Sequence, residues 1–176
     1  MYSNPEKTAV RKALADRTGL ALQTVRYDEE ALVGDHRGRN LRLYNFNKGR
    51  GGIYFCIDVE LARPAEPSLL IRSGLTGVLT SQVKDQTDRP AGQRFVDNFL
   101  VEGEPTDAVL RVLDSASIQG GLMAAFEHCG GVEAKTEDDR LVFEQLDQGQ
   151  HDADYLMDII ALLEELADAI EAEGSG

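Results

Sequence analysis

The segment 53–61 alternates strictly between two kinds of side chain. Its odd-numbered positions are all apolar, whereas its even-numbered positions carry Tyr54, Cys56, Asp58 and Glu60. Successive side chains of a strand point to opposite faces, so a period of two predicts a strand with one buried face. Antiparallel sheets commonly have one face in the core and one in solvent. We therefore expect a half-buried antiparallel strand whose odd-numbered residues lie in the core.

Shorter strand signals occur on both sides of this segment. Runs rich in leucine, β-branched or aromatic residues are separated by turn residues, and the acidic tip 137–139 is typical of a hairpin turn. The polar stretch 80–93 is expected to be a long surface loop. The other expected strands are 20–26, 41–44, 68–72, 94–102, 132–136 and 140–146.

Helix signals mark both ends of the chain. Pro5 follows Asn4 as in a capped helix start, and Gly19 can end that helix. From 154 to 171 the apolar residues recur at helical spacing, which predicts an amphipathic C-terminal helix.

A further helix is expected in the centre of the chain, broken once. Thr106 is a candidate cap for a first part at 107–113. The run 114–117 followed by the pair Gly120-Gly121 disfavours one continuous helix, because glycine is a poor helix former. The second part is expected at 118–128, ended by Gly130-Gly131.

The order of these elements shows no regular alternation of strands and helices. It predicts an α+β fold with a mainly antiparallel sheet of about 5–7 strands, on which an N-terminal helix, the broken central helix and a C-terminal helix pack. The chain has 176 residues, a length that suits one core. We expect a single domain over 1–173 and a flexible tail at 174–176.

Acidic residues dominate the charge of the chain. It carries 31 acidic and 18 basic residues, a net charge of −13, so its average surface repels nucleic acid. Its two cysteines, Cys56 and Cys129, do not form a dense disulfide pattern. The first seven residues lack the apolar core of a secretory signal, and no uncharged stretch approaches the ~20 apolar residues that cross a bilayer. We expect a cytoplasmic protein without membrane insertion.

The familiar catalytic motifs are absent from the sequence. It contains no P-loop, no dinucleotide-binding glycine pattern, no nucleophile elbow and no Cys-x-x-Cys pair. His128 precedes Cys129, but adjacent helical side chains point about 100° apart. The run 151–154 offers nitrogen and oxygen ligands, yet its carboxylates are better explained as a helix cap. We therefore predict no catalytic residue, no metal site and no cofactor.

The most unusual segment runs from residue 36 to residue 57, where no side chain is acidic. Its cations are interleaved with aromatic residues. Arg39 and Arg42 differ in parity, so in a regular strand they project from opposite faces. The glycine-rich stretch 47–52 is expected to be a hairpin connection. We predict that a partner is contacted through Arg37, Arg39, Arg42, Tyr44, Lys48 and Arg50.

These observations favour a non-catalytic protein-interaction or adaptor domain, with another protein or a second copy of the chain as partner. In element order, size and acidity the chain resembles acidic secretion-chaperone domains, which bind extended segments of client proteins and dimerise. This resemblance is one of layout and transfers no residue. One alternative is a hydrolase or transferase that uses His36, His128 or His151. A second alternative is single-stranded nucleic-acid binding through the basic segment 37–50.

Overall fold

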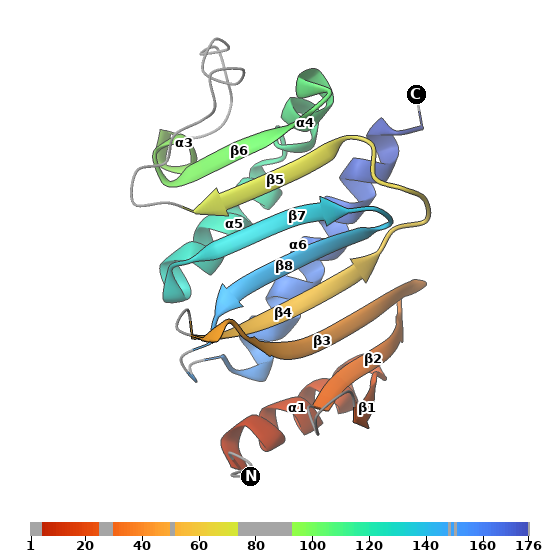
Figure 1. Cartoon of the computed structure of the whole chain (residues 1–176), viewed down its shortest axis with the longest axis vertical. Helices are drawn as coiled ribbons and strands as arrows, with labels where there is room; N and C mark the ends of the chain where they lie inside the picture. Colours follow the sequence, from red (N-terminus) through yellow and green to blue (C-terminus); the bar gives the residue numbers. More distant parts are fainter. Residues whose placement is uncertain are drawn as a thin grey trace.

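Eight antiparallel strands form one sheet in the spatial order β1-β2-β3-β4-β8-β7-β5-β6 (Figure 1). The computed structural model describes residues 5–24, 30–49, 52–73, 93–147, 149 and 151–175. The strands are Ala21–Thr24 (β1), Glu30–His36 (β2), Arg39–Asn47 (β3), Ile53–Glu60 (β4), Ser68–Ser73 (β5), Phe99–Glu104 (β6), Val132–Glu137 (β7) and Arg140–Leu146 (β8). The helices are Pro5–Thr18 (α1), Gln93–Asn98 (α3), Thr106–Val112 (α4), Ala116–Cys129 (α5) and Ala153–Glu173 (α6).

Helices cover one face of the sheet. In Figure 1 the helices α1, α4, α5 and α6 lie behind the strands. The long helix α6 packs against β4 and β8 in the centre of the sheet and against α1, α4 and α5 on its flanks. Within the described part of the chain no element covers the opposite face, which we call the open face.

Most of the odd-numbered side chains of 53–61 lie in the core, as the alternation predicted. Phe55 and Ile57 are buried under the helices. Ile53 is 44% exposed because it lies at the first position of β4, beside the connection to β3. On the open face Cys56 and Asp58 are also buried, because they lie between larger side chains of β3 and β8.

The C-terminal helix keeps its apolar stripe inside the protein. Asp152 occupies the N-cap position of α6, and its carboxylate accepts a hydrogen bond of 2.8 Å from the backbone N–H of Tyr155. This confirms the predicted helix cap at Asp152, whereas Asp154 forms an ion pair with Arg17. Because the stripe is buried, α6 does not offer it to a partner. Its buried apolar residues are Leu156, Ile159, Ile160, Leu162, Leu163, Leu166, Ala167 and Ile170.

The α+β fold class is confirmed, and the sheet has more strands than expected because 30–47 folds as two strands around a tight turn. The segment 94–98 is helical and belongs to α3, so only the second half of 94–102 is a strand. Pro105, not Thr106, holds the N-cap position of α4, and no side chain caps that helix. The expected loop at 80–93 falls outside the described residues except for Gln93, the first residue of α3.

The helices that the structure describes do not include a membrane span, since none of them combines sufficient length with sufficient apolar character.

Candidate functional site

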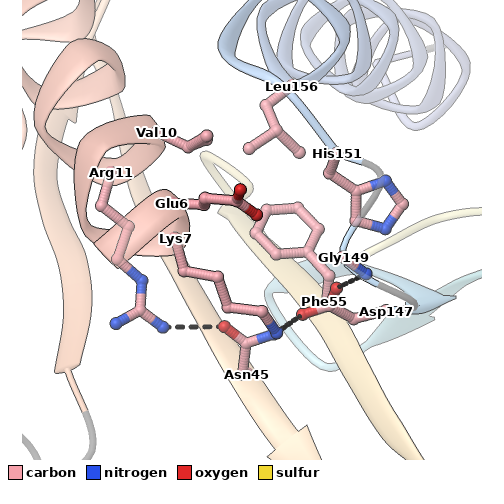
Figure 2. Close-up of a pocket in the computed structure, with 10 residues that line it drawn as sticks. All are labelled: Glu6, Lys7, Val10, Arg11, Asn45, Phe55, Asp147, Gly149, His151 and Leu156. Atoms are coloured by element: carbon pink, nitrogen blue, oxygen red, sulfur yellow. Dashed lines mark hydrogen bonds and ion pairs between the residues drawn. The ribbon is translucent and has the colours of Figure 1, made fainter. Parts of the chain in front are cut away.

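A cavity of about 60 Å³ lies between α1 and the ends of β3, β4 and β8 (Figure 2). Its apolar lining comes from Val10 on α1, Phe55 on β4 and Leu156 on α6. Sites for small molecules usually measure roughly 300–1,000 Å³, so this cavity has room for a few water molecules but not for a cofactor.

A chain of polar contacts forms one wall of this cavity. The Lys7 ammonium group lies 2.5 Å from an Asp147 carboxylate oxygen, which also accepts a 2.6 Å hydrogen bond from the Asn45 amide. Arg11 donates to the Asn45 carbonyl oxygen at 2.7 Å and to Glu30 at 3.0 Å. These contacts tie α1 to β2, β3 and the end of β8.

The polar contacts of this wall stabilise the ionised form of Asp147. Burial alone would raise the pKa of Asp147, but the hydrogen bonds from Lys7 and from the backbone N–H of Gly149 outweigh burial and hold the pKa below its ordinary value. Asp147 therefore serves as a fixed negative charge that holds α1 in place, and it is unsuited to act as a general acid.

The other wall is an aromatic stack around His151. Its ring centroid lies 5.2 Å from that of Tyr155, 5.6 Å from that of His128 and 5.8 Å from that of Phe55. Both ring nitrogens of His151 are buried, and within the described residues neither of them has a hydrogen-bond partner of good geometry. The nearby backbone of Leu146 acts to raise the pKa of His151. Burial is the largest influence and lowers the pKa of His151 below its ordinary value.

We expect the free energy of unfolding to fall as the pH drops below the ordinary histidine pKa of 6.5. The unfolded chain then binds a proton at residue 151 that the folded chain resists, so acid favours unfolding. Urea titrations between pH 7.5 and pH 5 measure this slope. His151→Phe keeps a ring in the stack but has no titratable group at this position. The free energy of unfolding of this variant should therefore depend less on pH. An equal slope in both proteins would assign the titration to other groups.

The described cavity lining contains no serine, threonine or cysteine nucleophile. The Tyr155 hydroxyl in the neighbouring stack is hydrogen-bonded to Gln145. His151 and His128 are brought together by the fold, while His36 lies elsewhere, with its Nδ1 atom 3.2 Å from the carbonyl oxygen of Thr18. In the described ranges no group of three or more His, Cys, Asp or Glu side chains is placed to hold a metal ion.

A second polar arrangement lies on the open face, where β3 and β4 pair. The Arg42 guanidinium carbon lies 4.8 Å from the centre of the Tyr44 ring, and the Tyr44 hydroxyl donates a 3.1 Å hydrogen bond to Asp58. Burial raises the pKa of Asp58, although the Tyr44 hydrogen bond opposes that change. Burial also raises the pKa of Tyr44 and brings that of the Cys56 thiol to about 12, so neither group ionises at neutral pH.

The same face continues toward the β3–β4 connection with two further aromatic rings. Phe46 is 47% exposed and lies opposite Tyr54 in the strand register. The Lys48 ammonium group lies 4.5 Å from the centre of the Tyr54 ring and forms an ion pair with Glu144. We call Arg42, Tyr44, Phe46, Lys48 and Tyr54 the aromatic–basic strip.

The predicted contact residues do not form one surface. Arg42, Tyr44 and Lys48 belong to the strip on the open face. Arg39 binds α6 on the helix-bearing face, as the difference in parity between Arg39 and Arg42 predicted, and Arg37 also contacts α6. Arg50 lies outside the described residues.

The arginines of the β2–β3 turn are paired with acidic residues of α6. Arg39 donates two hydrogen bonds of 2.8 Å to the Glu171 carboxylate and also pairs with Asp168. Arg37 lies 3.3 Å from Glu164. A polar groove of about 490 Å³ beside Arg39 is lined mostly by charged side chains. The acidic helix of the protein itself thus neutralises this half of the basic segment.

Sequence reasoning noted Phe46 and Tyr54 among the aromatic residues of the basic segment but did not count them as contact residues, and around the cavity it named only His151 as a candidate functional residue. Phe46 has the parity of Arg42 and Tyr44, and Tyr54 lies opposite Phe46 in the register of β3 and β4. The meeting of Lys7, Asn45 and Asp147 has no local signal, since these residues come from three distant parts of the chain.

Comparisons with known proteins found a similarity of fold and no similarity of sequence. No family model and no curated protein matches the sequence. Among solved structures, the fold is similar to the crystal structure of the mycobacterial trehalose monomycolate transport factor A, TtfA, with a TM-score of 0.59 over 92% of each chain. The two sequences are 9% identical, so the likeness concerns the fold and not the site.

Proposed function

We propose that the chain is a non-catalytic protein-interaction or adaptor domain that receives its partner on the aromatic–basic strip. The observation that carries the proposal is the exposure of Phe46, 47% of its surface, among Tyr and cationic side chains on a sheet face that no described element covers. Aromatic residues and arginine are enriched where proteins bind one another.

The strip also suggests the chemistry of the partner segment. Lys48 already forms an ion pair with Glu144, whereas Arg42 lies over the Tyr44 ring and interacts electrostatically with Asp58, the residue opposite it in β4. Arg42 is half-buried, so an acidic side chain of a partner can still approach it, and an apolar side chain can pack on Phe46 and Tyr54. We infer that the partner presents a segment with both acidic and apolar residues.

Composition bears on the location of the proposed adaptor domain. A low cysteine content is in keeping with a cytoplasmic location. The fold is shared with a protein named as a transport factor, but a fold at 9% identity does not carry a function, so the proposal rests on the strip itself.

Two single substitutions test the strip. Arg42→Glu and Phe46→Ala should each weaken partner binding at least about tenfold, because central aromatic and arginine residues dominate interface energies. The measurement compares proteins captured from cell extract by the wild type and by each variant, and then titrates the purified partner that both variants lose.

Arg72→Glu is the matched control, because Arg72 is exposed on the same face but lies on β5, away from the strip. Retention of the partner by this variant supports the proposal. Equal loss with Arg42→Glu and Arg72→Glu, together with full capture by Phe46→Ala, would indicate a general charge effect. Unchanged capture by both strip variants would refute the proposal.

A further inference from the structure

The two edges of the sheet differ in charge, although both edge strands contact a helix, β1 contacting α1 as β6 contacts α4. At one edge β6 carries Glu102 and Glu104 and contacts α4. Charged side chains and neighbouring helices are the usual means by which edge strands avoid pairing with other chains. At the other edge β1 has the sequence Ala-Leu-Gln-Thr, with no charged residue, and in the described structure it pairs only with β2.

The β1 edge is open as well as uncharged. All four of its residues are exposed, and Leu22 has 50% of its surface exposed, the largest fraction among the described large apolar residues. From residue 18 to residue 25 the sequence holds no charge at all, in a chain where 28% of residues are charged. An unpaired, uncharged strand of this kind is a template for pairing with another strand.

We propose that β1 is the contact through which two copies of this chain form a homodimer, each β1 pairing antiparallel with the other. This inference goes beyond the proposed function because it concerns a different surface. Leu22 lies opposite the core residue Leu32 and so belongs to the helix-bearing face. A two-fold axis normal to the sheet, midway between Leu22 of one copy and Leu22 of the other, sets the two Leu22 side chains against each other on that face. It also sets Ala21 opposite Gln23 of the second copy, and the two sheets become continuous.

A second copy fits this edge because the edge is complementary to itself. Each copy brings a strand without charge, so the antiparallel pair contains no like-charge contact. In a two-fold pairing of β6 centred on Glu102 or Gly103 the glutamates would face one another, so this edge is less complementary to itself. The net charge of −13 on each chain makes two copies repel each other, and salt screens this repulsion. We therefore expect the dimer to strengthen as salt is added.

Sedimentation equilibrium of the full chain tests this proposal at low and high salt and over a wide range of protein concentration. The wild type should form dimers more readily at high salt. Leu22→Lys places two ammonium groups opposite each other and should weaken association at least about tenfold. Phe46→Lys is the matched control, since it makes the same kind of change at a similarly exposed site on the open face. It should leave the dimer unchanged.

Cross-linking provides a second readout that does not depend on a charge change. In a Cys129→Ser background, Leu22→Cys should join two chains through a short bismaleimide, whereas Phe46→Cys should not. The native Cys56 is buried and should not react.

A wild type that stays monomeric under all conditions would overturn the dimer proposal. Equal weakening by Leu22→Lys and Phe46→Lys would also overturn it, because the effect would then not depend on the β1 edge. Weakening by Phe46→Lys alone would overturn it too, and would assign self-association to the open face. Leu22→Lys should leave partner binding by the aromatic–basic strip intact, so failure of this proposal is distinguishable from failure of the proposed function.

Discussion

Replacing Arg39 by glutamate is expected to lower the free energy of unfolding by about 3 kcal/mol. The Arg39 side chain is only 14% exposed and holds Glu171 with two parallel hydrogen bonds while also pairing with Asp168. The variant would set three carboxylates together at a partly buried site. Breaking a buried pair costs roughly 3–5 kcal/mol, and the partial exposure of this site favours the lower end of that range.

Acid should reduce this loss. The hydrogen bond from Arg39 is the main reason that the pKa of Glu171 lies below its ordinary value of 4.5. A lowered carboxyl pKa contributes stability that is present above pH 4.5 and disappears as the pH falls through the folded-state value. The stability difference between wild type and Arg39→Glu should therefore shrink below pH 4.5. Urea unfolding at pH 7 and at acidic pH measures both effects.

Arg39→Lys is the matched control for this site. Lysine retains the charge but cannot form the two parallel hydrogen bonds, so a loss of about 1 kcal/mol is expected. An Arg39→Glu protein with the unfolding midpoint of the wild type would show that the ion pairs with α6 contribute nothing. The expected loss also makes Arg39 a poor probe of partner binding, because its substitution would weaken the fold itself.

Gly103→Ala is expected to lower the free energy of unfolding by about 3 kcal/mol. A methyl group at this position would lie 2.1 Å from the backbone oxygen of Ser68 and 2.7 Å from a methyl carbon of Val109. The Ser68 oxygen belongs to the paired strand β5 and Val109 to the buried face of α4. Neither can move without disturbing the β5–β6 pair or the packing of α4. Thermal and urea unfolding measure the loss.

Gly120→Ala provides the contrast with Gly103→Ala. Gly120 lies within α5, and a methyl group there would meet nothing within 4 Å. Alanine is the better helix former, so this variant should be more stable than the wild type by roughly 0.5–1 kcal/mol. If both variants changed the free energy of unfolding by a similar amount, the close approach of Ser68 to Gly103 would not explain the loss of stability in Gly103→Ala.

The aromatic–basic strip was only partly readable from the sequence. Strand parity placed Arg39 and Arg42 on opposite faces, and the structure confirms that separation. The alternation in 53–61 also predicted which face of β4 is buried, but it could not tell which helix would cover that face. The covering of one face is decided by α6, which folds more than one hundred residues later in the chain and packs on β4 and β8. Because α6 packs on the opposite face, Arg42 and Tyr44 lie on the open face, and Arg39 pairs with acidic residues of α6.

By itself the sequence determined the local features of this protein. The period of two in β4, the helical stripe of α6 and the cap at Asp152 depend on residues that are near one another in the chain, and their geometry repeats within a few residues. The tertiary structure alone decided which distant segments meet. β4 pairs with β8 and β5 with β7, His151 stacks on His128, and Lys7 reaches Asp147. Such contacts follow from the burial of a common core, which depends on all elements together, and no local pattern encodes them.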